Sequence, residues 1–296
     1  MSGITLPRRD TSARREMWAR AFYRFRQSLL SVVGLALVVA LIVVALLAPW
    51  IVPYPEHVAG ATDTAARFIA PGREYWFGTN ALGQDMLSLV IAGSRVSLFS
   101  GLAVVAISIV VGGIVGAIAG YFGGWVDEVL MRFTDLLLTI PALILAMAVA
   151  AALGSGIGNM IIAISITWWP AYARLIRGEV MVKKEEQFVT AARALGAGSG
   201  RILGRHILPN IVSPVVVKAS LDMGFAILTV ASLGFVGIGV KPPTPEWGTL
   251  LSIARASMPD YWWTALFPGF AIFIAVLAFN LLGDGLRDVL DPRARR

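Results

Sequence analysis

The sequence predicts an all-α protein that crosses a membrane several times, and three observations indicate this. The chain has 296 residues, of which 57% are apolar and only 15% are charged, with a mean hydropathy of +0.75. Soluble domains average about 45–50% apolar and about 25% charged residues. The apolar residues are gathered in long uncharged stretches, and the cations lie mostly in alternate connections between them. This pattern excludes an ordinary soluble fold.

Six transmembrane helices are predicted, because a bilayer core of about 30 Å requires roughly 17–25 apolar residues per helix. We place them at 29–52, 96–122, 136–153, 157–173, 211–233 and 263–282. Only Gly154-Ser155-Gly156 separates the third from the fourth, which predicts a helical hairpin. The first stretch exceeds the roughly 7–15 apolar residues of a signal peptide, so we expect it to remain as an anchor.

The positions of the 25 Lys and Arg residues predict the orientation. Nineteen lie in the basic N-terminal segment 1–28, the second and fourth connections and the C-terminal tail, whereas five lie in the alternate connections. Because cytoplasmic connections are enriched in Lys and Arg, both termini are expected in the cytoplasm, with a transmembrane domain over 29–296. The connections 53–95 and 234–262 are then external, and the connection 174–210 is cytoplasmic. The positive charge thus reflects topology rather than binding to nucleic acid.

Two features inside the predicted helices bear on assembly. Gly112, Gly116 and Gly120 repeat at four-residue spacing, which is typical of close helix packing in membranes, either within one subunit or between subunits. Lys218 and Asp222 are four residues apart in the fifth stretch and therefore share a helix face. We interpret them as an intramembrane ion pair, with a role in lining a translocation path or in a proton relay as alternatives.

The cytoplasmic connection 174–210 contains a short amphipathic segment. Glu186 precedes an apolar stripe at i, i+3, i+4 and i+7, which predicts a helix with one apolar face. The stripe consists of Phe188, Ala191, Ala192 and Leu195. Gly196 is expected to end this helix.

A second short helix is predicted to follow, with Ser199 as its cap and Pro209 at its end. Its apolar side comprises Ile202, Leu203 and Ile207. Both helices are too short to cross a membrane. The segment therefore fits the bilayer surface, the protein's own helices or a groove on a cytoplasmic partner.

Residues 190–196 and 205–210 carry a resemblance to a known family. The first run is Thr190-Ala191-Ala192-Arg193-Ala194-Leu195-Gly196, and the second is Arg205-His206-Ile207-Leu208-Pro209-Asn210. Together they resemble the EAA loop of ABC importer permeases, with Thr190 where that pattern has Glu and His206 where it has Ile. The second run is similar to the form found in the dipeptide/oligopeptide (and nickel) transport branch, in its C-type permeases.

Further segments resemble the same branch, and they occur in the same order along the chain. They are 76–80 with 83–85, 119–127, 242–248 and 280–288. Asn80 and Gln84 depart from the branch pattern in the first of these. Together with the EAA loop, these four segments make five matches in the same order, and they identify the chain as a member of this family.

The resemblance implies the fold of a type I ABC importer permease in the bacterial inner membrane. It implies a second homologous permease, two ATP-binding subunits that hold ATP and Mg, an external solute-binding protein and the surrounding lipid as partners. It also implies that the EAA segment is a cytoplasmic coupling helix that docks on an ATP-binding subunit. By matching position, the coupling residues are Glu186, Phe188, Ala191, Ala192, Arg193, Leu195 and Gly196.

The external connections contain aromatic and acidic residues that have two interpretations. Tryptophans at the ends of transmembrane helices usually anchor them at the membrane interface. The same loops could instead dock or gate the solute-binding protein. The residues predicted for docking or gating are Trp76, Phe77, Asp85, Glu246 and Trp247.

The sequence predicts a transport subunit rather than an enzyme. A phosphate-binding P-loop requires a Gly-Lys pair, and none of the four lysines follows a glycine. The chain has no cysteine, and its two histidines, His57 and His206, are expected on opposite sides of the membrane, so no metal site or catalytic triad is predicted. No cofactor is expected on this chain, and ATP hydrolysis is expected on separate subunits.

The predicted cargo is a dipeptide or oligopeptide delivered by the solute-binding protein. Nickel complexes, glutathione and opines are alternatives within the same kind of machine. A more distant alternative is a secondary transporter driven by protons or sodium and using Lys218 and Asp222. No inverted repeat is evident, and the coupling loop would have no use in such a transporter.

Overall fold

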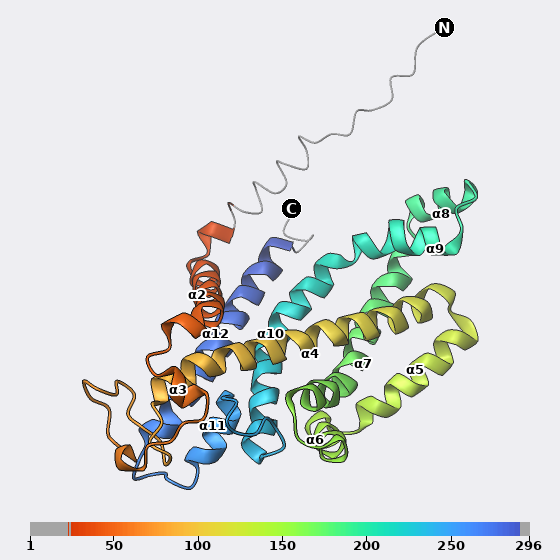
Figure 1. Cartoon of the computed structure of the whole chain (residues 1–296). Helices are drawn as coiled ribbons and strands as arrows, with labels where there is room; N and C mark the ends of the chain where they lie inside the picture. The colour runs from red at the N-terminus through yellow and green to blue at the C-terminus, as the bar shows by residue number, and fades with distance from the viewer. Residues whose placement is uncertain (1–22, 24, 291–296) are drawn as a thin grey trace.

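The computed structural model describes residue 23 and residues 25–290 (Figure 1), and every regular element in that range is helical. Most of the basic segment 1–28 and the tail 291–296 therefore lie outside the described residues. The long helices are α2 (Leu29–Ile51), α4 (Met86–Phe122), α5 (Gly124–Thr139), α6 (Ala142–Leu153), α7 (Ile157–Lys183), α10 (Val212–Val236) and α12 (Trp263–Leu290). Shorter helices are α3 (Pro55–Val58), α8 (Gln187–Ala194), α9 (Ser199–Arg201) and α11 (Trp247–Ala254).

Four of the described helices are long and apolar enough to cross a membrane: α2, α4, α10 and α12. The pair α5 and α6 adds a fifth if it is counted as one bent span. Helix α7 contains the predicted stretch 157–173 but is not among them, because Trp168, Trp169 and Pro170 shorten its apolar part. The described part of the chain therefore has four or five candidate transmembrane helices, and the predicted six are not confirmed exactly.

The predicted third stretch, 136–153, is not one straight helix. Helix α5 ends at Thr139, and α6 begins at Ala142 with a bend of 91° between the two axes. Ile140 has an extended backbone because Pro141 follows it, and a residue before proline is driven out of the helical region. This is the physical reason why a charge-free stretch is here not a continuous helix.

Several helices extend beyond their predicted stretches, and one of them is α12, which ends at Leu290 instead of the predicted 282. Helix α4 begins at Met86, within the connection predicted at 53–95, because the Asp85 carboxylate accepts hydrogen bonds from the Ser88 backbone N–H (2.8 Å) and hydroxyl (2.6 Å). Helix α7 continues to Lys183, so the first part of the connection predicted at 174–210 is helical. Polar helical segments of this kind carry no hydropathy signal.

Helices α4 and α7 pack closely through the predicted glycine series. A Cβ on Gly112 would lie 2.5 Å from the carbonyl oxygen of Trp169, and a Cβ on Gly120 would lie 2.7 Å from that of Arg177. Gly116 meets the Ala173 carbonyl in the same way. The contacts advance in the same direction along both helices, so α4 and α7 run parallel. The series therefore packs within one subunit, which was one of the two alternatives for it.

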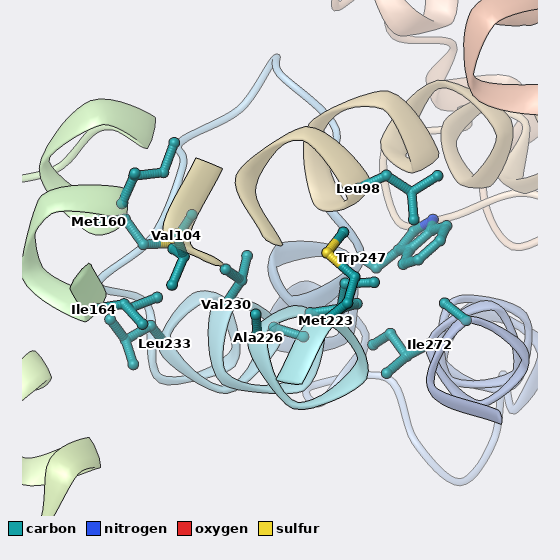
Figure 2. Packing of buried hydrophobic residues seen from close by; sticks show 14 of the residues in the cluster. Leu98, Val104, Met160, Ile164, Met223, Ala226, Val230, Leu233, Trp247 and Ile272 are labelled. Atoms are coloured by element: carbon teal, nitrogen blue, oxygen red, sulfur yellow. The ribbon is translucent and has the colours of Figure 1, made fainter. Parts of the chain in front are cut away.

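The main apolar core lies between α4, α7, α10, α11 and α12 (Figure 2). Its labelled members are Leu98, Val104, Met160, Ile164, Met223, Ala226, Val230, Leu233, Trp247 and Ile272. Helix α2 packs on α12 at the side of this core, where a Cβ on Gly34 would lie 2.7 Å from Leu281. The exposed faces of α2 are apolar, as expected for a helix that faces lipid or another subunit.

The two ends of the bundle carry different loops. Figure 1 shows the start of α2 and the end of α12 on the same side as α8 and α9, whereas α3 and α11 lie at the opposite end. At that opposite end the Trp263 indole donates a hydrogen bond of 3.1 Å to the Thr79 carbonyl, which joins the 53–95 connection to α12. The connection 53–95 is thus a folded part of the molecule.

Candidate functional site

The predicted coupling segment, residues 186–210 and called the coupling segment below, contains a helix, α8, that ends as its sequence predicts. Gly196 follows the helix with a φ of +80°. The backbone N–H of Ala197 donates to the Ala192 carbonyl and that of Gly196 donates to the Arg193 carbonyl, both at 3.0 Å. This pair of bonds is the Schellman motif, which needs a residue with positive φ and therefore favours glycine.

The faces of α8 differ from the predicted stripe. Val189 and Ala192 point inward and pack with Ile202, Ile207 and Ile211. Phe188 and Leu195, which were predicted on the same apolar face as Ala192, are 40% and 88% exposed. An eight-residue helix has too few positions to fix the phase of a stripe, and Val189 on the inner face was not predicted.

The exposed apolar side of α8 is the feature that a partner would contact. Phe188, Ala191 and Leu195 are all exposed and lie at i, i+3 and i+7, which places them along one flank of the helix. The neighbouring Glu186 and Arg193 are exposed as well. An exposed apolar row with a charged rim is typical of a helix that binds a groove on another protein.

The second half of the coupling segment is not the capped helix that the sequence predicts. Gly198, not Ser199, is the residue before α9, and no side chain caps the helix. Residues Ile202–Ile207 form a π-helical turn, which places Ile202 and Ile207 together in the apolar cluster beneath α8. π-Helical turns are rare and are frequently found at functional sites.

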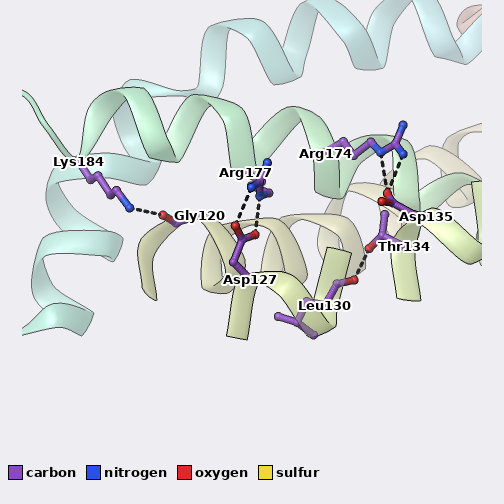
Figure 3. A network of polar contacts seen from close by, with 8 residues as sticks. All are labelled: Gly120, Asp127, Leu130, Thr134, Asp135, Arg174, Arg177 and Lys184. Atoms are coloured by element: carbon purple, nitrogen blue, oxygen red, sulfur yellow. Dashed lines mark hydrogen bonds and ion pairs between the residues drawn. The ribbon is translucent and has the colours of Figure 1, made fainter. Parts of the chain in front are cut away.

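Two ion pairs join α5 to α7 close to the coupling segment (Figure 3). The Arg177 guanidinium donates two hydrogen bonds to the Asp127 carboxylate, at 2.5 and 2.6 Å. Arg174 donates to Asp135 at 2.7 and 3.2 Å. The sequence prediction did not include these residues. The available signal was two acids on one amphipathic segment and two arginines at three-residue spacing on the next long helix.

Lys218 and Asp222 form the predicted ion pair on α10, with 2.9 Å between the ammonium nitrogen and a carboxylate oxygen. The Lys218 ammonium also lies 5.1 Å from the centre of the Tyr172 ring on α7, a cation–π distance. Tyr172 is fully buried. The pair thus packs against α7, and its role in transport stays a prediction.

The residues predicted to dock a solute-binding protein occupy different environments. Asp85, Glu246 and Trp247 are buried inside the chain, so in this conformation they do not form a contact surface. Phe77 is partly buried and stacks on Phe267 at 3.9 Å between ring centroids. Trp76 is 70% exposed and remains available for a partner or for the membrane interface.

Glu246 instead holds α11 against α4. Its carboxylate accepts hydrogen bonds from the Gly248 and Thr249 backbone N–H groups, both at 2.8 Å, and from the Ser97 hydroxyl at 3.3 Å. Burial raises the pKa of the Glu246 carboxyl, and these hydrogen bonds oppose that rise. A buried carboxylate with this many donors is typical of a structural helix cap.

Comparison with known proteins identifies the family. Residues 112–296 match the family described as the binding-protein-dependent transport system inner membrane component, and residues 16–71 match the N-terminal TM domain of oligopeptide transport permease C. The chain therefore belongs to this family: it is an ABC importer permease and a multi-pass membrane protein.

Two kinds of relative are similar over nearly the whole chain. The dipeptide transport system permease protein DppC of Alkalihalophilus pseudofirmus is 41% identical over 280 residues, covering 94% of this chain and 90% of the relative. The glutathione transport system permease protein GsiD is 45% identical over 281 residues in both Escherichia coli and Shigella boydii, covering 95% of this chain and 92% of the relative.

Proposed function

We propose that this chain forms, with a second homologous permease, the translocation path of an importer for small peptides. Two ATP-binding subunits, which hold ATP and Mg, would dock on its cytoplasmic side, and an external solute-binding protein would deliver the cargo. No cofactor is proposed on this chain. The coupling residues would be Glu186, Phe188, Ala191, Ala192, Arg193, Leu195 and Gly196.

The exposed apolar flank of α8 carries this proposal. Leu195 is 88% exposed, and Phe188, two helical turns earlier on the same flank, is 40% exposed. Full burial of one such side chain contributes roughly 1.5–3 kcal/mol. In this arrangement Ala192 supports docking indirectly, because it anchors α8 to the apolar cluster beneath it.

The proposed orientation places both termini and α8 in the cytoplasm. It is supported by the distribution of Lys and Arg and by the position of α8 on the same side as the start of α2 and the end of α12 (Figure 1). The external side would then carry α3, α11 and the exposed Trp76. A solute-binding protein would approach this end.

The proposed cargo is a peptide of a few residues. Of the relatives named above, one is a dipeptide permease and two are permeases for glutathione, which is itself a tripeptide. Selection among such cargoes would rest mainly on the solute-binding protein. Nickel complexes and opines remain alternatives for the same machine.

Reconstitution of the complete importer in proteoliposomes tests the proposal. Peptide uptake is expected to require ATP on the side of α8 together with the solute-binding protein on the other side. Leu195→Glu is expected to weaken binding of the ATP-binding subunits about 10–100-fold, whereas Leu195→Met should retain it. Uptake driven by a proton gradient without ATP would instead support a secondary transporter and overturn the proposal.

A further inference from the structure

The two ion pairs between α5 and α7 differ in how strongly they are shielded from water. The side chains of Asp127 and Arg177 are 16% and 33% exposed, and they form two parallel hydrogen bonds. Those of Asp135 and Arg174 are about half exposed. Paired, charge-assisted bonds of the Asp127–Arg177 kind fix the relative orientation of two groups as well as their distance. This pair therefore sets the position of α5 against α7.

The same network reaches the coupling segment. Lys184, the residue directly after α7, donates a hydrogen bond of 3.0 Å to the Gly120 carbonyl near the end of α4 (Figure 3). Val189 on the inner face of α8 packs in one apolar cluster with Ile176 and Val180 of α7. The coupling helix is thus held on the part of α7 that carries Arg174 and Arg177.

Two backbone interruptions lie along the chain at the borders of this region, which also packs against the last part of α4. Pro170 lies inside α7, before Arg174, and a proline within a helix removes a backbone hydrogen bond. On the other side, Ile140 and Pro141 separate α5 from α6 at the 91° bend. The ion pairs therefore connect α5 with the part of α7 that follows Pro170. Both segments lie on the α8 side of these interruptions.

We propose that α5, the part of α7 after Pro170 and the coupling helix α8 move as one unit, and that Asp127 and Arg177 are the positioning residues that hold it together. When an ATP-binding subunit displaces α8, this ion pair would transmit the displacement to α5. The inference rests on the proposed function, because it requires that α8 docks on such a subunit. It goes beyond that function by assigning the transmission to one pair of side chains.

Charge substitutions in the complete reconstituted importer test the proposal. Arg177→Met and Asp127→Asn are each expected to leave ATP hydrolysis in place while peptide uptake per ATP falls about 10-fold, within the usual range for coupling between two sites. The exchange Asp127→Arg with Arg177→Asp is expected to restore uptake per ATP. Glu128→Gln with Arg132→Met is the matched control, because this pair lies exposed on α5 with its charged atoms 3.9 Å apart.

A chemical cross-link provides a second test that does not depend on the exchange variant folding. The chain has no cysteine, so Asp127→Cys with Arg177→Cys introduces two defined thiols. Uptake per ATP is expected to be low in this variant and to rise towards the wild-type value when a short thiol-reactive cross-linker joins the two positions. Treatment of the cysteine-free chain in the same complex controls for effects on other subunits.

Two results would overturn the inference. One is an unchanged uptake per ATP in both single variants, and the other is a cross-link that leaves uptake per ATP low or stops it. Co-purification of the ATP-binding subunits separates this outcome from a failure of the proposed function. If the ATP-binding subunits bind the variants as they bind the wild type, these results overturn only the transmission of movement from α8 to α5. If they do not bind even the wild-type chain, the proposed function fails.

Discussion

Trp247 at the start of α11 donates its indole N–H to the Val90 carbonyl on α4, 2.9 Å away. The contact is close because Gly93 lies beneath the ring, where a Cβ would be 3.0 Å from the indole. Together with the bond between Glu246 and Ser97, it holds α11 on α4 at the end of the bundle opposite α8. Glu246 and Trp247 are therefore part of the fold rather than of its surface.

Replacing Glu246 tests whether it is such a structural cap. Glu246→Ala leaves the N–H groups of Gly248 and Thr249 without an acceptor in a buried site. We expect a loss of about 2 kcal/mol in the free energy of unfolding, measured as a lower thermal midpoint in detergent. Thr244→Ala, an exposed position in the same loop, is the control. Equal midpoints for both variants would contradict the cap.

The raised pKa of Glu246 predicts a pH dependence. Between pH 4.5, the ordinary value, and its raised pKa, the carboxyl is ionised in the unfolded chain but protonated in the folded one. Its contribution to stability therefore falls as pH rises through this window and is constant below and above it. The unfolding midpoint of the wild type relative to Glu246→Gln should decline over the same range. Parallel midpoint curves would mean that burial does not raise this pKa.

The glycine series predicts a contrast between two nearby positions. Gly116→Ala places a methyl group against the Ala173 carbonyl, whereas a Cβ on Gly113 has its nearest neighbour, Ile176, at 3.6 Å. We expect Gly116→Ala to cost about 1–3 kcal/mol. Gly113→Ala should be neutral or stabilising by up to about 1 kcal/mol, because alanine favours helix. Thermal unfolding of the two variants measures the difference, and similar losses at both positions would exclude close α4–α7 packing.

The external connection 53–95 is predicted to depend on Trp263. Trp263→Phe removes the hydrogen bond to the Thr79 carbonyl but retains an aromatic ring, at a cost of about 1 kcal/mol. Hydrogen exchange of the backbone around Thr79 should become faster. Trp262→Phe is the control, since Trp262 is half exposed. Unchanged exchange in Trp263→Phe would show that other contacts hold this connection.

The sequence predicted much of this architecture because hydropathy is a property of long stretches of the chain. The two ends of α2, the starts of α10 and α12, the packing of Gly112 and the stop at Gly196 all depend on such patterns or on one residue's backbone requirement. The bend at Pro141 and the π-helical turn at Ile202–Ile207 do not, because each is decided by local backbone geometry.

The candidate sites were predicted less well than the helices, for a related reason. Whether Phe188 or Val189 faces inward depends on how a short helix packs, which composition does not encode. Likewise, the pairing of Asp127 with Arg177 joins positions 50 residues apart and requires the fold itself. Burial of Glu246 follows only from the contact of α11 with α4.

A photo-activated cross-linker attached at position 195 tests the central claim, that this chain couples to an ATP-binding subunit through α8. Leu195→Cys introduces a single thiol into a chain without cysteine. In the assembled importer, the label at position 195 is expected to attach to an ATP-binding subunit, whereas the same label at Leu266→Cys on α12 should not. Attachment from position 195 only to lipid, in a complex that contains the ATP-binding subunits, would contradict the account.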